Sequence, residues 1–218
     1  MPMKERYRDR RAAGEALATA LDHYRGRDNL LILALPRGGV PVAAPVAEHL
    51  GAALDLLLVR KLGVPRHEEL AMGAIASGGV MVLNEDVIQS RRIGEATLEA
   101  VLAREREELG RRDRHYRGDR PEPDPAGRVV IVVDDGLATG ATMRAAVSAL
   151  RQRRPARVVV AVPVASREAE AVLLREADEV VCPLVPAPFF GVGDWYRNFI
   201  QTGDEEVRAL LARYWEDR

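Results

Sequence analysis

Four short apolar runs, separated by helical patterns, set the hydrophobic pattern of the chain. Rich in leucine or β-branched residues, they are typical of strands buried on both faces of a sheet. The runs are Leu30 to Leu35, Leu54 to Val59, Val129 to Val133, and Val158 to Val162. Between them, apolar residues such as Val42, Val46 and Leu50 recur at helical spacing. The alternation predicts an α/β fold with a central, mostly parallel sheet flanked by helices. An earlier helix, from about Arg11 to Tyr24, is expected to pack across the sheet.

The segment from Met72 to Pro125 carries patterns of a different kind. Met72 to Leu83 places Gly78-Gly79 between two apolar stretches, which predicts a hairpin that serves as a flap. Helices are expected from Asn84 or Glu85 to Gln89 and from Glu95 to about Tyr116. The second is densely charged, but its acidic and basic residues alternate. That pattern favours a solvated helix with i,i+4 ion pairs over a nucleic-acid-binding face.

Composition sets the scale of the fold. The chain has 218 residues, of which 47% are hydrophobic, and this is enough for one large core. We therefore expect a single domain over residues 1–218, with its core over about 28–185. A helical insertion over about 84–120 and a small hood, formed by a C-terminal extension over about 186–218, complete the expected organisation.

Charge and cysteine content indicate the expected cellular location and binding partners of the protein. Lys and Arg total 32 and Asp and Glu total 33, so no global field would attract nucleic acid or an anionic membrane. Any anion site must therefore be local. The single cysteine, Cys182, cannot form an intramolecular disulfide, and the sequence shows neither a leader-like start nor a long uncharged apolar run. We expect a cytoplasmic location, with no membrane or nucleic-acid partner.

The sharpest chemical signal is a strand that ends in two carboxylates, Asp134 and Asp135, and continues through a small-residue loop into a helix. In an open α/β sheet, ligands bind beyond the carboxyl ends of the strands. Backbone N–H groups of the loop Ala138-Thr139-Gly140-Ala141-Thr142 and the start of the next helix would form a phosphate cradle. The Gly-Lys-Ser/Thr of a Walker loop and the Gly-x-Gly of a dinucleotide site are both missing. Paired carboxylates suit ribose hydroxyls or a cation, so a sugar phosphate is the expected ligand.

This segment resembles the motif by which the type I phosphoribosyltransferase family binds phosphoribosyl pyrophosphate (PRPP): four apolar residues, two acidic residues and a Thr-Gly-rich loop. Residues 130–142 match it throughout, and the chain as a whole resembles stand-alone bacterial phosphoribosyltransferase-domain proteins of unassigned substrate. The resemblance implies the type I phosphoribosyltransferase fold and transfer of 5-phosphoribosyl from PRPP to a nitrogen acceptor, such as a nucleobase, with release of pyrophosphate. Mg²⁺, held mainly by PRPP and water, a role in nucleotide metabolism and a homodimer are further expectations.

The resemblance also assigns residue roles. Asp134 and Asp135 would be catalytic, and the loop of residues 138–142 would hold the 5′-phosphate of PRPP. The loop Pro36-Arg37-Gly38-Gly39 would bind pyrophosphate, with Arg37 catalytic as well and the Pro36-Arg37 peptide expected to be cis. Arg60 and the catalytic Lys61 would reach the same pyrophosphate. Residues 66–69 would form a mobile lid, in which Glu68 or Glu69 is a candidate base.

The acceptor side of the site is less defined. Phe189, Phe190 and Trp195 could stack on a planar base beneath the hood, or pack a C-terminal extension onto the core, and the sequence leaves both readings open. Relatives that act on hypoxanthine or guanine carry Asp where this chain has Ala138, so we expect those purines to be poor substrates. A regulatory protein that senses PRPP or a nucleotide with a non-catalytic form of this fold is the alternative function.

Overall fold

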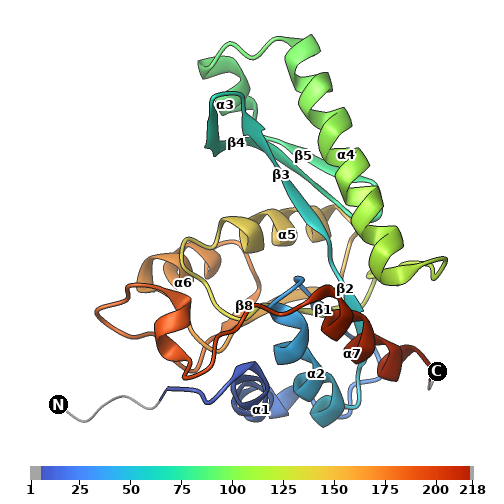
Figure 1. The fold of residues 1–218 in the computed structure, drawn as a ribbon, viewed down its shortest axis with the longest axis vertical. Helices are drawn as coiled ribbons and strands as arrows, with labels where there is room; N and C mark the ends of the chain where they lie inside the picture. Colours follow the sequence, from blue (N-terminus) through green and yellow to red (C-terminus); the bar gives the residue numbers. More distant parts are fainter. Residues whose placement is uncertain (1–5, 217–218) are drawn as a thin grey trace.

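The computed structural model describes residues 6–216 and places a five-stranded sheet at the centre of the fold (Figure 1). All neighbouring strands in this sheet are parallel, which confirms the expected α/β organisation. In spatial order the strands are β2 (Ala53–Leu56), β1 (Leu30–Ala34), β6 (Val129–Val133), β7 (Arg157–Ala161) and β8 (Glu179–Val181).

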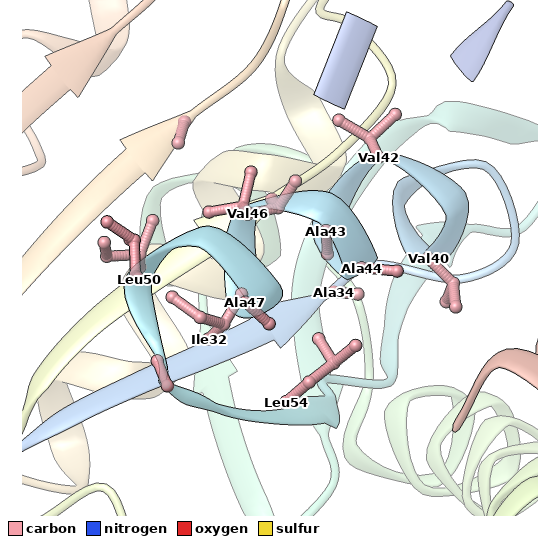
Figure 2. Close-up of a cluster of buried hydrophobic side chains, with 14 of the residues drawn as sticks. Ile32, Ala34, Val40, Val42, Ala43, Ala44, Val46, Ala47, Leu50 and Leu54 are labelled. Atoms are coloured by element: carbon pink, nitrogen blue, oxygen red, sulfur yellow. The ribbon is translucent and has the colours of Figure 1, made fainter. Parts of the chain in front are cut away.

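Helices cover both faces of this sheet, because alternate residues of a strand point to opposite sides. One face packs against α2 (Gly39–Leu50), and Figure 2 shows Val42, Val46 and Leu50 along one side of that helix, as their spacing predicts. The opposite face packs against α5 (Ala141–Gln152) and α6 (Arg167–Leu173).

The first helix, α1 (Arg10–Ala20), is shorter than expected and lies elsewhere. It is followed by a short 3₁₀ helix, η1 (Asp22–Tyr24). The main neighbour of α1 is α2 rather than the sheet itself. A side chain at Gly14 would collide with the backbone of Val42, so glycine allows the two helices to approach this closely. Helix α1 therefore forms an outer layer, which corrects its expected place across the sheet.

The C-terminal helix, α7 (Asp204–Glu216), is also part of the core rather than of a hood. Val207 and Leu211 are fully buried in the cluster that contains α2. The Tyr214 hydroxyl donates to the carbonyl of Ala44 at 2.7 Å and fixes the helix there. Residues 204–216 of the expected hood segment therefore pack in the core.

A second, antiparallel sheet projects from the core together with two helices, and we call this segment, residues 59–117, the arm (Figure 1). The expected Gly78-Gly79 hairpin is confirmed, with both glycines at positive φ. The predicted strand from Leu54 to Val59 is confirmed as β2 only up to Leu56, because the chain then leaves this sheet and enters the second sheet at Val59. The arm consists of β3 (Val59–Val64), β4 (His67–Ala76), β5 (Val80–Leu83), α3 (Glu85–Ser90) and α4 (Glu95–Arg117).

Helix α4 joins the arm to the core through buried charges. Its expected i,i+4 ion pairs are present, as in Glu108 with Arg112 at 2.7 Å. It is not solvated throughout, however. The Arg117 guanidinium is buried and pairs with the buried Asp55 of β2 at 2.7 Å. Near the middle of the helix, Glu105 is buried as well. Across residues 6–216, neither α4 nor another helix is long and apolar enough to cross a membrane.

Candidate functional site

Two loops meet where the neighbouring strands β1 and β6 end. Ala34 and Val133 are in register, so the loop after each strand starts at the same level. A side chain at Gly38 would collide with the Asp135 carboxylate, and one at Gly39 would lie 2.6 Å from the carbonyl oxygen of Val133. The glycines therefore let the first loop lie directly against the strand that carries the carboxylates. The structure brings together Pro36 to Gly39 and the acidic pair, and the Pro36-Arg37 peptide is cis, as expected.

An arginine that the sequence analysis missed holds one of the two carboxylates. Arg10, the first residue of α1, places its Nε 2.8 Å from Asp135 Oδ2. The same guanidinium donates to the carbonyl of Ile200 at 2.7 Å and lies 4.0 Å from the centre of the Phe199 ring. A cation at the N-terminus of a helix is repelled by the helix dipole unless an anionic group lies nearby. The position of Arg10 at the start of α1 was therefore the sequence signal that a carboxylate from another part of the chain lies next to it.

The two carboxylates are largely enclosed, and this raises their proton affinity. Burial, and then the charge of Asp135, raise the pKa of Asp134 well above its usual range. Burial also raises the pKa of Asp135, against the opposing effect of Arg10. The Asp135 backbone N–H donates to Asp134 Oδ1 at 2.8 Å, and the Tyr196 hydroxyl donates to the Asp135 carbonyl at 2.6 Å. The pair is thus held in place before a ligand binds.

The loop over residues 138–142 has the form of an anion cradle. Gly140 caps α5 with a φ of +72°, a left-handed conformation that favours glycine. Ser166 anchors the loop, because its hydroxyl donates to the carbonyl of Ala138 at 2.7 Å. Thr139 and Thr142 are exposed. Since the first amides of a helix lack intrahelical acceptors, those at the start of α5 can bind a phosphate.

A cavity of about 530 Å³ lies next to the first loop, on its arm side. Helix α4 and the segment before α7 supply its other walls. We call it the arginine cavity, because most of its charged lining residues are cationic. The Arg, His and Asp residues of its lining are Arg10, Arg37, Arg111, Arg112, His115 and Asp204.

The other two expected cations lie elsewhere in this structure. Arg60 Nη2 pairs with the buried Glu105 of α4 at 2.5 Å, so Arg60 anchors the arm helix and does not reach the first loop. Lys61 lines a separate cavity of about 570 Å³ between the arm sheet and α5. Neighbouring strand residues point to opposite faces, and this sends the two side chains apart. A role for Lys61 at pyrophosphate stays a prediction.

The aromatic segment divides between packing and exposure. Phe189 and Trp195 are partly buried in a cluster with Tyr196 and Val164, which favours packing for these two rings. Phe190 is 84% exposed. Two further predicted residues lie on the arm: Glu68 is exposed at the start of β4, and the side chain of Glu69 falls outside the described part of the structure.

The carboxylates are also the groups best suited to a divalent cation. Hard oxygen ligands are what Mg²⁺ prefers, and it usually keeps several waters and binds through one or two carboxylates plus substrate phosphates. Among residues 6–216, no three metal-binding side chains of the His, Cys, Asp or Glu type are grouped. Asp134, whose carboxylate has no cationic partner of its own within that range, fits an ion that takes most of its ligands from the substrate.

Comparison with known proteins decides the family. The model of the phosphoribosyl transferase domain family matches residues 5–204. The chain belongs to this phosphoribosyltransferase family. The fold agrees with the α/β organisation expected for this family, a central parallel sheet with helices on both faces.

Two sets of relatives extend the match. The crystal structure of the protein TT1426 from Thermus thermophilus is 47% identical and superimposes with a TM-score of 0.87, covering 96% of this chain and 99% of that one. Proteins of Mycobacterium tuberculosis strains H37Rv and CDC 1551 are 47% identical over 209 residues, and their names assign a phosphoribosyl transferase activity only provisionally. The chain spans about half the length of these mycobacterial relatives.

Proposed function

We propose that the protein transfers the 5-phosphoribosyl group of PRPP to a nitrogen acceptor in a Mg²⁺-dependent reaction that releases pyrophosphate. The contact between the two strand-end loops carries this proposal. Gly38 and Gly39 lie against Asp135 and Val133, so a diphosphate bound at the first loop and a sugar bound at the carboxylates would be adjacent. PRPP joins those two groups at C1 of its ribose.

Each part of PRPP has a matching surface. The amides and hydroxyls of residues 138–142 suit the 5′-phosphate, because they donate hydrogen bonds without placing a cation there. Asp134 and Asp135 suit the ribose hydroxyls. Arg37 of the first loop suits the pyrophosphate.

The reaction needs positioning and charge stabilisation more than covalent participation by the protein. The bond from C1 to the pyrophosphate oxygen breaks with its electron pair leaving on pyrophosphate. The lone pair of the acceptor nitrogen forms the new bond to C1, and the proton on that nitrogen passes to solvent. Bound Mg²⁺ would neutralise part of the charge on pyrophosphate. Asp135, fixed by Arg10, would hold the ribose while positive charge develops at C1.

One kind of catalytic help to the acceptor is excluded by the loop over residues 138–142. Ala138 is exposed in the loop and offers no carboxylate, so general-base help from that position is absent. We expect hypoxanthine, guanine and xanthine to be poor acceptors. Phe190 is a ring free to stack on a planar acceptor.

Pyrophosphate release tests the proposal. Purified protein is incubated with PRPP and Mg²⁺ and a panel of acceptors that includes hypoxanthine, guanine, adenine and orotate, with a no-acceptor control. Acceptor-dependent release supports the transferase, and loss of release on chelation of Mg²⁺ supports the role of the ion. Tight PRPP binding without release on any acceptor would favour the regulatory, sensing function instead.

A further inference from the structure

Three groups from two elements converge on one carboxylate in the arginine cavity. The Tyr116 hydroxyl of α4 donates to Asp204 Oδ1 at 2.6 Å. Arg37 Nη1, from the first loop, lies 3.7 Å from the same oxygen, and His115 Nε2 lies 3.6 Å from Oδ2. Both separations are too long for hydrogen bonds; the Arg37 contact is an ion pair, and the His115 contact is one only when the imidazole is protonated. Asp204 therefore stands where a small anion would find donors on several sides.

The charge of the cavity exceeds what Asp204 neutralises. Four arginines line it, against one lining carboxylate. Three of them have other partners: Arg10 pairs with Asp135, and Glu108 pairs with both Arg111 and Arg112 at 2.7 Å. Even after these pairings, four arginines face three carboxylates. The excess of positive charge is local to this cavity, because the chain as a whole carries a formal net charge of −1.

Arg111 and Arg112 of α4 do not hold the arm against the core. The helix meets the core through Arg117 and the buried Asp55, and it meets β3 through Glu105 and Arg60. Arg111 and Arg112 make neither contact. Both pair with Glu108 within the helix, but their side chains are 64% and 41% exposed, so a ligand can still reach them.

We propose that the arginine cavity binds the pyrophosphate group, with Arg111, Arg112 and His115 of the arm joining Arg37, and that the Asp204 carboxylate occupies this position until the anion displaces it. The inference rests on the proposed function for the identity of the anion. It adds that the arm contributes to the substrate site through α4, and that the first residue of α7 competes with the ligand. The hydrogen bond from Tyr116, with smaller contributions from Arg37 and His115, lowers the pKa of Asp204, so the competing group is a carboxylate at neutral pH.

Opposite effects of two substitutions test this. Binding of inorganic pyrophosphate to the full chain is measured by calorimetry. Arg112→Gln should weaken pyrophosphate roughly tenfold, because a charge-assisted contact is lost. Asp204→Asn should strengthen it about two- to fivefold, since a competing exposed charge is removed while the amide oxygen can still accept from Tyr116. Arg106→Gln, the same charge change on α4 outside this cavity, is the matched control and should leave the affinity unchanged.

Two ligands separate the inference from the proposed function. Ribose 5-phosphate should bind all three variants as it binds the native protein, whereas PRPP should follow pyrophosphate. Equal pyrophosphate affinity in Arg112→Gln and Arg106→Gln, or no gain in Asp204→Asn, would overturn the inference. So would a failure of the native protein to bind pyrophosphate. If instead the pyrophosphate effects appear as expected but PRPP yields no turnover, the cavity is an anion site and only the transferase proposal fails.

Discussion

The two surfaces assigned to the phosphates of PRPP are built in different ways. The loop over residues 138–142 contains no cationic side chain and is fixed by Gly140 and Ser166, so its donors are backbone amides and hydroxyls on a rigid frame. The arginine cavity gathers long cationic side chains from separate parts of the chain. A rigid neutral cradle suits the 5′-phosphate, which stays on the ribose throughout. Flexible charges suit the pyrophosphate, whose charge grows and which must then depart.

The acidic pair lies between the two surfaces, and its removal should have the largest effect. In Asp134→Asn with Asp135→Asn we expect PRPP affinity to fall more than about a hundredfold, because ribose and cation contacts are lost together. Calorimetric titration measures the loss. As a control, inorganic pyrophosphate in the absence of Mg²⁺ should bind nearly as it binds the native protein. An unchanged affinity for PRPP would contradict the assignment of the carboxylates.

Arg37→Ala should separate the two surfaces. We expect pyrophosphate affinity to fall roughly ten- to 150-fold, the usual range for a lost charged hydrogen bond, and ribose 5-phosphate affinity to change less than about twofold. Arg37→Lys should recover only part of the loss, because Lys lacks the planar fork of donors. Equal losses for both ligands would show that the two loops have been assigned the wrong way round.

Gly140→Ala tests the rigid cradle. A side chain at a φ of +72° should cost about 1–2 kcal/mol of stability and weaken ribose 5-phosphate without affecting pyrophosphate. Gly79→Ala, at a φ of +74° in the arm hairpin with open space around its Cβ position, is the matched control. Thermal unfolding with and without ribose 5-phosphate measures both. If the two variants bind ribose 5-phosphate equally, Gly140 is a structural residue only.

The smallest effect we expect is on stability against pH. Because the pKa of Asp134 is raised in the fold, the folded chain holds a proton that the unfolded chain releases near pH 4. Stability should therefore fall as pH rises above about 4 toward the raised pKa of the folded chain. Asp134→Asn removes this loss, so its Tm at neutral pH should exceed that of the native protein. Asp204→Asn should change Tm in the opposite direction, since the pKa of Asp204 is lowered in the fold.

The sequence predicted the parts of the site that are contiguous. Each of the two loops joins one strand to the helix that follows it. The glycines that these loops need, Gly38, Gly39 and Gly140, lie within the same short stretches of sequence. The main sheet was equally accessible, because its strands are uniformly apolar. The split after Leu56 was not, since an apolar run gives no sign that the chain changes sheets within it.

The parts that the sequence did not predict depend on distant partners. Arg10 contacts Asp135, 125 positions away. Arg111 and Arg112 follow a charge pattern that is equally typical of a solvated helix, and only the cavity beside them distinguishes the two cases. Arg60 and Lys61 were assigned to one ligand, although adjacent strand residues point to opposite faces. Local spacing carries no information about which of two neighbours meets the ligand.

The contacts of Tyr7 and Arg10 with residues 195–200 have a consequence for the order of assembly on the ribosome. Tyr7 donates its backbone N–H to Trp195, and Arg197 donates back to Tyr7, while Arg10 reaches Ile200. At a synthesis rate of about 5–20 residues per second, roughly 3 to 13 s separate the addition of Asp135 from that of Ile200. Through that interval the nascent chain carries both loops and the acidic pair without the contacts that orient Arg10. A product that stops shortly before Trp195 would contain the phosphate-binding motif in full and still lack the frame that holds Asp135 in position.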